Sequence, residues 1–238
     1  MTQVRIYTLE KIFKDGTIKL SDKNLHYLSN VMRKKVGDQI NIFNENSGEW
    51  NTTIIEINKF IIVKVNKLVR KPAAQKDIWL FFGMTKSRKV KLLVEKVTEI
   101  GVTRIIPIDT EFSERFKINT KKMKKIAIEA VEQSNQINPP IIEFNVKLEK
   151  LVKNFKDNRV KLLCDENLES PNILDFLSKN KTQKLAIFIG PVGGWSRKDR
   201  FFLTKLNNLY SISLGSSVLK IDTASIFSVA CCNLLMDC

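Results

Sequence analysis

The sequence predicts an α/β protein in two parts: a small β-barrel module, followed by a mostly parallel sheet with helices on both faces. Up to about residue 70, several short stretches alternate apolar and polar side chains, which is typical of the strands of a small barrel. Beyond that point, apolar runs alternate with stretches of helical periodicity, which is typical of a doubly wound sheet. The stretch 70–77 has no periodicity and contains the first proline, so we interpret it as a linker and expect domains at 1–70 and 71–238.

The first domain is expected to begin with a β-hairpin. Asp15-Gly16 lies between 11–13 and 17–20, and such a dipeptide between apolar runs is a strong hairpin signal. Alternation predicts further strands at 40–42, 53–57 and 61–65, with turns at 37–38 and 47–48. A helix that Ser21 or Asp22 can cap interrupts the strands. Its apolar stripe consists of Leu25, Leu28, Val31 and Met32.

In the second domain, strands and helices are expected to alternate. Strands are predicted at the apolar runs 78–82, 104–108, 160–164, 185–189 and 209–214. Helices are predicted at 86–100 and at the terminal run 224–236. A further helix, which follows the strand at 104–108, is predicted to extend through Glu132. Within 224–236 only Ser225, Ser228 and Asn233 are polar, so we expect the terminal helix to be buried on most sides. Part of this burial is expected to be against the second subunit of a homodimer.

The net charge is the unusual property of the composition. Lys and Arg number 40 against 25 Asp and Glu, which gives +15. Such an excess favours a polyanionic partner. Basic side chains cluster at Arg33-Lys34-Lys35 and along the helix at 86–96, although a lysine-rich composition and a solvated helix face are alternative reasons for such clusters.

Several classes of protein are disfavoured. The first 13 residues contain no continuous apolar run, and the stretch 224–236 is shorter than a membrane span, so we expect a cytosolic protein. The four cysteines show no C-x-x-C spacing and there is one histidine, so we expect reduced cysteines and no zinc site. The motifs of α/β-hydrolases, P-loop proteins and dinucleotide enzymes are missing from the sequence.

Two glycine loops in the last third of the chain are the most informative motif. The loop 190–194 (GPVGG) follows the apolar run 185–189, and the loop 214–217 (LGSS) follows 209–213. Glycine has no Cβ, so it adopts positive φ and lets a flat ligand approach the backbone. Because we expect the two strands to be neighbours, the loops predict a nucleotide-type pocket at one edge of the sheet; ordinary turns are the alternative.

Five segments of the chain match one known family in the same order. They are 26–38 (HYLSNVMRKKVGD), 92–107 (LLVEKVTEIGVTRIIP), 129–134 (EAVEQS), 189–194 and 213–224. Together they resemble the RsmE-type methyltransferases of the SPOUT superfamily. The resemblance implies a PUA-like barrel that binds RNA, and an α/β domain with a deep trefoil knot that binds S-adenosylmethionine. It also implies a homodimer that methylates N3 of one uridine in the 16S rRNA of the small ribosomal subunit.

The resemblance places the cofactor among residues of the two loops and the terminal helix. These are Ile189, Gly190, Pro191, Gly193, Gly194, Ser213, Leu214, Gly215, Leu219, Thr223 and Ala224. We assign stabilisation of charge on the uracil oxygens to Lys220 or Arg88, and we take Asp222 as the candidate base, unless it only caps the terminal helix. The residues expected to contact RNA are His26, Arg33, Lys34, Lys35, Lys86 and Arg88.

The sequence departs from the family at four site positions. Val192, Ser217, Lys220 and Asp222 stand where the family usually has Glu, Arg, Arg and Glu. The first two departures each remove a charged group, and lysine cannot reproduce a bidentate guanidinium contact. One alternative is therefore an RNA-binding factor of the same fold with weak or lost catalysis. Another is a related SPOUT enzyme that acts on tRNA.

Overall fold

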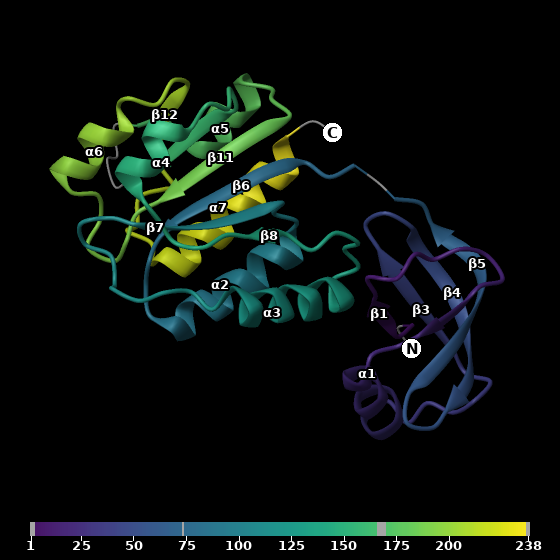
Figure 1. The fold of residues 1–238 in the computed structure, drawn as a ribbon. Helices are drawn as coiled ribbons and strands as arrows, with labels where there is room; N and C mark the ends of the chain where they lie inside the picture. The colour runs from purple at the N-terminus through teal and green to yellow at the C-terminus, as the bar shows by residue number, and fades with distance from the viewer. Residues whose placement is uncertain (1–2, 73, 166–169, 237–238) are drawn as a thin grey trace. The chain divides into compact units, whose positions relative to one another are not determined.

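The computed structural model describes residues 3–72, 74–165 and 170–236, which form two compact units (Figure 1). The first unit consists of Met1–Ala74 together with Val131–Asn138. The second consists of Gln75–Ala130 together with Pro139–Cys238. The division after Ala74 falls inside the predicted linker, but the sequence does not predict that Val131–Asn138 belongs to the first unit.

The first unit contains a curled five-stranded sheet. Its strands are β1 (Arg5–Tyr7), β2 (Thr17–Lys19), β3 (Gln39–Asn44), β4 (Gly48–Ile57) and β5 (Ile61–Arg70). They lie in the order β1-β3-β4-β5-β2; β1 is parallel to β3, and the other neighbouring pairs are antiparallel. Alternate apolar residues of these strands, such as Ile42, Ile54 and Val63, are fully buried in its core.

The predicted hairpin around Asp15-Gly16 is wrong. Residues 11–13 form no strand, and β2 pairs with β5 instead, with Ile18 opposite Val63. The amide of Asp15 donates to the carbonyl oxygen of Val65 at 3.1 Å, so β5 also holds the turn. The reason is that β5, ten residues long, offers β2 a row of backbone partners and a buried place for Ile18.

The predicted helix after Ser21 is present, but its period changes. Helix α1 (Asp22–His26) continues directly into a π-helical stretch, η1 (Tyr27–Val31). A π-turn contains more residues than an α-turn, so the predicted apolar stripe loses its phase. Leu28 is therefore fully buried, whereas Val31 is 59% exposed.

The second unit contains a parallel sheet of seven strands. They are β6 (Asp77–Gly83), β7 (Arg104–Asp109), β8 (Ile141–Ile142), β9 (Val146–Lys147), β10 (Val160–Cys164), β11 (Lys184–Ile189) and β12 (Leu209–Ile212). Their order is β12-β10-β11-β6-β7-β8, and β9 also pairs with β7. The five longer strands are those that the sequence predicts, while β8 and β9 are too short to leave a periodic signal.

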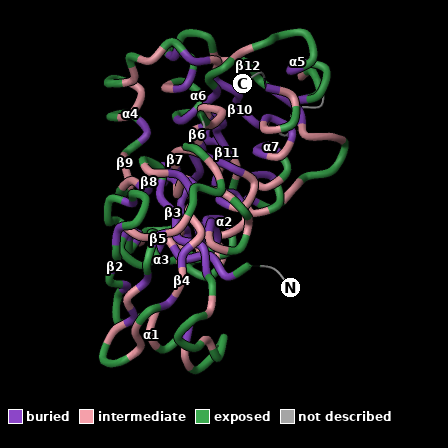
Figure 2. Tube along the Cα trace, turned by 90° about the vertical axis from the view of Figure 1, so that its right-hand side faces the viewer, coloured by how far each residue is buried: buried purple, intermediate pink, exposed green. Residues whose placement is uncertain are grey.

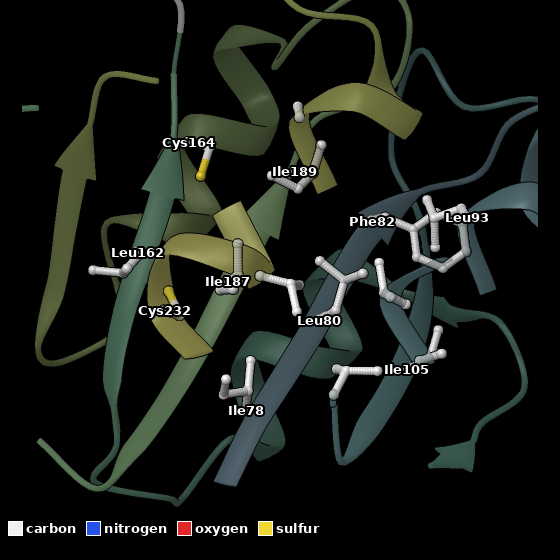
Figure 3. Packing of buried hydrophobic residues seen from close by; sticks show 14 of the residues in the cluster. Ile78, Leu80, Phe82, Leu93, Ile105, Leu162, Cys164, Ile187, Ile189 and Cys232 are labelled. Atoms are coloured by element: carbon white, nitrogen blue, oxygen red, sulfur yellow. The ribbon is translucent and has the colours of Figure 1, made fainter. Parts of the chain in front are cut away.

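Helices cover both faces of this sheet. α2 (Ser87–Ile100), α5 (Ile173–Lys179) and α7 (Ile221–Leu235) pack on one face together with α3 (Thr120–Gln133), and α4 (Leu148–Asn154) and α6 (Arg197–Leu203) pack on the other. Side chains alternate between the two faces: Leu80 and Ile187 point toward the α7 side (Figure 3), whereas the Phe81 and Phe188 rings stack on the other side at 4.5 Å. The long strands between these layers are mostly buried (Figure 2).

The predicted fold class is confirmed in its α/β sheet with helices on both faces and in its curled N-terminal sheet. The strand order does not by itself define a knot, so the knot stays a prediction. The helices α4, α5 and α6 are not predicted from the sequence, because seven residues make only two turns. No helix of the described ranges is long and apolar enough to cross a membrane.

The terminal helix α7 is less buried than its composition predicts. Leu234 is 80% and Phe227 39% exposed, whereas Ser225 and Ser228 are fully buried. The buried hydroxyls donate to carbonyl oxygens of α7 itself, Ser225 to Ile221 at 2.7 Å and Ser228 to Ser225 at 3.2 Å. Because the serines satisfy their hydrogen bonds within the helix, they can face the core and leave apolar residues on the outside.

Candidate functional site

A pocket lies in the second unit at the carboxyl ends of β10, β11 and β12. Its cavity of about 400 Å³ is within the range typical of small-ligand sites. Its walls are the loops 189–195 and 214–220, the start of α7, and four further side chains: Lys89, Cys164, Asp165 and Arg200. In the sheet, β10 separates β11 from β12, so the prediction that these two strands are neighbours is wrong. Their loops nevertheless meet at the same edge, because all three strands are parallel.

Most residues predicted to bind a cofactor line this pocket. They are Ile189, Gly190, Pro191, Gly193, Gly194, Leu214, Gly215, Leu219 and Ala224. Ser213 and Thr223 are not among the lining residues. Ser213 is buried, and its hydroxyl lies 3.3 Å from both the amide nitrogen and the carbonyl oxygen of Gly215, so it shapes the loop. Thr223 is exposed on α7.

Three glycines shape the pocket for different reasons. Gly215 has a φ of +118°, and apart from its two chain neighbours no atom of the described residues lies within 4 Å of the place that a Cβ would take. At Gly190 a Cβ would lie 3.2 Å from the indole nitrogen of Trp195. At Gly83, the last residue of β6, a Cβ would lie 2.5 Å from the backbone nitrogen of Pro191. Gly83, which is not predicted from the sequence as a site residue, lets the loop after β11 lie directly on the backbone of β6.

The loop after β11 is held firmly at the end that leads into α6. Trp195 donates from its indole nitrogen to the carbonyl oxygen of Cys164, 3.3 Å away on β10. Ser196 and Asp199 then form a capping box at the start of α6: the Ser196 hydroxyl accepts from the Asp199 amide at 3.0 Å, and the Asp199 carboxylate accepts from the Ser196 amide at 3.2 Å. These contacts fix the wall of the pocket before any ligand binds.

An ion pair between Asp165 and Arg200 joins two walls of the pocket. The guanidinium of Arg200 donates to both oxygens of the Asp165 carboxylate, one of them at 2.8 Å. The Asp165 side chain is 7% exposed and that of Arg200 is 45% exposed. Neither residue is predicted from the sequence as part of the site, although Asp165 directly follows a predicted strand, which is the signal that could have placed it at this edge.

The three predicted catalytic residues are not brought together. Lys220 is exposed and lines the pocket. Arg88 is exposed at the start of α2 and does not line it, whereas its neighbour Lys89 does. Asp222 lies in the first turn of α7, where Lys220 occupies the N-cap position, so the alternative role of Asp222 as N-cap is wrong. One oxygen of the Asp222 carboxylate is buried and has no hydrogen-bond partner in the described chain.

The residues predicted to contact RNA are divided between the two units. In the first unit, Arg33 and Lys35 are exposed after η1, Lys34 is half-buried, and the Nδ1 atom of exposed His26 lies 2.9 Å from the side-chain nitrogen of Asn30. In the second unit, Lys86 and Arg88 are exposed at the start of α2. Their contact with RNA stays a prediction.

The cysteines near the pocket are apolar in character. Cys164, Cys231 and Cys232 are buried and reduced, and burial raises the pKa of the Cys164 and Cys232 thiols well above the usual value, so both thiols are neutral. Cys238 lies outside the described residues. Within the part of the chain that the structure describes, no group of three His, Cys, Asp or Glu side chains is placed to hold a metal ion.

Two family models match the chain. The model described as an RNA methyltransferase domain matches residues 72–233, and the model described as an RNA methyltransferase PUA domain matches residues 20–66. The chain belongs to the RNA methyltransferase family. The PUA match lies within the first unit, from α1 into β5, and the methyltransferase match includes the whole pocket.

This RNA methyltransferase is similar along most of its length to proteins named ribosomal RNA small subunit methyltransferase E. The protein of that name from Rickettsia conorii is 33% identical over 97% of this chain and 95% of its own. Ribosomal RNA small subunit methyltransferase E 2 from Borreliella burgdorferi is 30% identical over 90% of each chain. The resemblance to the RsmE-type enzymes is thereby confirmed.

Solved structures share the fold of this methyltransferase. A methyltransferase from Legionella pneumophila in complex with S-adenosylmethionine superimposes with a TM-score of 0.87 at 23% identity and covers 99% of both chains. A ribosomal RNA small subunit methyltransferase E from Neisseria gonorrhoeae, bound to S-adenosylmethionine, has a TM-score of 0.86 at 19% identity over 99% of this chain and 98% of its own.

Proposed function

We propose that this methyltransferase transfers the methyl group of S-adenosylmethionine to N3 of a specific uridine in the 16S rRNA of the small ribosomal subunit. The observation that carries the proposal is the pocket at the carboxyl ends of β10, β11 and β12. Parallel α/β sheets bind ligands at such an edge, and the cavity has room for a nucleoside-sized molecule. The net charge of +15 suits an RNA substrate.

The residues of the pocket fit this cofactor. The free space beside Gly215 can receive a flat adenine against bare backbone. Ile189, Leu214 and Leu219 supply apolar surface, and the backbone of the two loops supplies hydrogen-bonding groups. When bound there, S-adenosylmethionine supplies a methyl group on a positively charged sulfur, and holding that group in line with the uridine N3 accounts for much of the acceleration.

The charged residues of the chain are proposed to act on the uracil. N3 must lose its proton, and negative charge then develops on the neighbouring carbonyl oxygens. Lys220 and Lys89 line the pocket and can stabilise this charge. Asp222 stays the candidate base: it does not itself line the pocket, but it lies in the first turn of α7, next to the pocket-lining Ile221. Arg88 stays a candidate for contact with a phosphate.

The substitution Asp222→Asn tests the proposed base. If Asp222 accepts the N3 proton, turnover at saturating S-adenosylmethionine falls by about 100-fold or more, since general bases contribute at least that much. The affinity for the cofactor, measured by calorimetry, stays the same because Asp222 does not line the pocket. Unchanged turnover would exclude Asp222 from the proton transfer.

Incubation of the protein with labelled S-adenosylmethionine and small-subunit rRNA tests the function itself. We expect incorporation of label, and mass analysis of the nucleosides should locate it as N3-methyluridine. Binding of cofactor and rRNA without incorporation would favour the RNA-binding factor, an alternative suggested by the uncharged Val192 and Ser217 in the pocket wall. Label in tRNA alone would favour the tRNA enzyme. No heat of binding at saturating cofactor would contradict the proposal.

We also propose that the methyltransferase acts in the cytosol as a homodimer formed by its second unit. The apolar side chains of Phe227 and Leu234 on the outside of α7 support this assembly, because a second copy would remove them from water.

A further inference from the structure

The first turns of α2 and α3 carry an unusual concentration of positive charge. Neither helix has an acidic residue in its first turn. The cations of this region are Lys86, Arg88, Lys89 and Lys91 at the start of α2, and Lys121, Lys122, Lys124 and Lys125 at the start of α3. We call these eight residues the α2–α3 basic surface. All belong to the second unit, and all except the half-buried Lys89 and Lys91 are exposed.

These charges do not serve the stability of the helices. The N-terminus of a helix carries a partial positive charge, so a cation there is unfavourable and a carboxylate favourable. Lysines placed for helix stability would stand in the last turns, yet neither helix has a basic residue in its last turn. The distribution of charge is thus reversed in both helices, which indicates that a negatively charged partner offsets it.

The two groups of cations form one continuous surface. α2 and α3 lie side by side (Figure 1), and the side chains of Lys91 and Lys122 are close enough that Lys122 lowers the pKa of Lys91, through a side-chain contact and through charge repulsion. The nearby acids of α2 do not neutralise this surface, because Glu95 and Glu99 both contact Lys96 at 2.8 Å. No ion pair joins the four α3 lysines to a carboxylate of the described chain.

This surface begins at the pocket. Lys89 is both part of the surface and part of the pocket wall. Next to Lys89 in the first turn of α2 lies Arg88, which shares a helix face with Lys91 three residues further on, and the Lys91 side chain contacts Lys122 of α3. A polyanion that lies on the surface would therefore have one of its units beside the pocket.

We propose that the α2–α3 basic surface binds the phosphate backbone of the RNA next to the nucleotide whose base enters the pocket. The inference rests on the proposed function and adds the path of the substrate, which includes the α3 lysines. RNA is favoured over an anionic membrane because the surface leads into a pocket for a single base and is built of charged rather than apolar side chains. Its contacts would hold the strand in position without reading its sequence.

The test compares two variants that lose the same positive charge. The first replaces the α3 lysines: Lys121→Gln, Lys122→Gln, Lys124→Gln and Lys125→Gln. The matched control replaces four exposed lysines in and beside α4, on the other face of the sheet: Lys147→Gln, Lys150→Gln, Lys153→Gln and Lys156→Gln. Thermal melting and calorimetry with S-adenosylmethionine, which should match the wild type in both variants, show that each variant is folded and binds cofactor.

The affinity for a 16S rRNA fragment is measured by fluorescence anisotropy, without cofactor and at several salt concentrations. We expect the α3 variant to bind at least about 10-fold more weakly at low salt, and the slope of log affinity against log salt to become smaller by roughly 3 if all four lysines contact phosphates. The control should bind like the wild type. An equal loss in both variants, or no loss in the α3 variant, would overturn the proposal. The proposal would also be overturned if the α3 variant lost binding to anionic lipid vesicles but kept its RNA affinity, because the surface would then bind a membrane.

The readouts separate this inference from the proposed function. If the wild type binds RNA through the α3 lysines but methylates nothing, the surface is supported and the activity is contradicted. If the wild type methylates rRNA and the α3 variant keeps its RNA affinity and salt slope, the activity is supported and the surface is contradicted.

Discussion

At the scale of single residues, the pocket depends on one position without a side chain and on one buried carboxylate. Gly83 leaves room for the loop that begins at Gly190, and Asp165 fixes Arg200 across the opening. Each contact joins parts of the chain that are far apart in sequence, so a change of one side chain at either place moves a wall of the cofactor site.

Gly83→Ala is expected to weaken the binding of S-adenosylmethionine by roughly ten-fold and to destabilise the protein by about 1–3 kcal/mol. The added methyl group would lie 2.5 Å from the backbone nitrogen of Pro191, so the loop must shift. Calorimetry and urea unfolding measure the two effects. Gly16→Ala is the control: the nearest atoms to its methyl group would belong to the ring of Phe13, which is 58% exposed and can turn away. Wild-type affinity in Gly83→Ala would contradict this account of the loop.

Arg200→Gln is expected to destabilise the protein by about 1 kcal/mol and to weaken cofactor binding several-fold, because the nearly buried Asp165 carboxylate loses the ion pair that joins the two walls of the pocket. Arg197→Gln on the same helix is the control, since Arg197 is exposed and does not line the pocket. Urea unfolding and calorimetry are the measurements. Equal behaviour of the two variants would show that the ion pair does not support the pocket.

At the scale of elements, a buried network in the first unit joins β1, β3, β4 and β5. The Glu49 carboxylate accepts from Arg5 at 3.0 Å, from Asn41 at 2.9 Å and from Arg70 at 2.7 Å. Arg5 also donates to the carbonyl oxygens of Val131 and Gln136, at 2.7 and 2.8 Å. The same guanidinium thus stabilises the sheet and holds the segment Val131–Asn138 in the first unit.

Glu49 gives the first unit a dependence on pH. Burial acts to raise the pKa of Glu49, but the hydrogen bonds and charges of its partners outweigh burial and hold the pKa below its usual value of 4.5. Because the folded state then binds the proton more weakly than the unfolded state, the stabilisation is complete above pH 4.5 and is lost as the pH falls toward the lowered pKa.

Unfolding by urea between pH 7 and pH 3 measures this effect. The free energy of unfolding of Glu49→Gln should be roughly 3 kcal/mol lower than that of the wild type at pH 7, because two arginines remain without their carboxylate. The variant should also lose less stability in acid than the wild type. Glu10→Gln, at an exposed position, is the control. The same acid dependence in Glu49→Gln and in the wild type would refute the assignment.

At the scale of the whole molecule, the chain forms two compact units and leaves apolar residues of α7 on the surface of the second. The buried serines and the exposed Phe227 and Leu234 are the reverse of what a helix at the surface of a monomer needs. The proposed association of two copies would remove this conflict.

Leu234→Glu is expected to convert the proposed homodimer into a monomer while each chain stays folded, since Leu234 is 80% exposed within one chain. Sedimentation equilibrium gives the mass and circular dichroism the fold. Leu9→Glu, at an 87% exposed position of the first unit, should remain dimeric. A wild-type protein that sediments as a monomer would contradict the homodimer.

The parts of the fold that local pattern specifies could be predicted from the sequence. The runs 78–82 and 185–189 become the central strands β6 and β11, because an apolar run between turns fits a strand that is buried on both faces. The loops 190–194 and 214–217 line the pocket as the glycines indicate. The predicted hairpin at Asp15-Gly16 is wrong because a turn does not determine which strand pairs with the one that follows it, and here β2 pairs with β5.

The sequence by itself thus determined the α/β class, the glycine loops and the excess of positive charge, since each depends on residues close together in the chain or on composition alone. Only the tertiary structure decided that Gly83 supports Pro191, that Asp165 pairs with Arg200, that Arg5 holds residues 126 positions away, and that the cations of α2 and α3 form one surface. The physical reason is that periodicity reports which face of its own element a residue occupies, whereas a contact depends on which distant element the folded chain brings to that face.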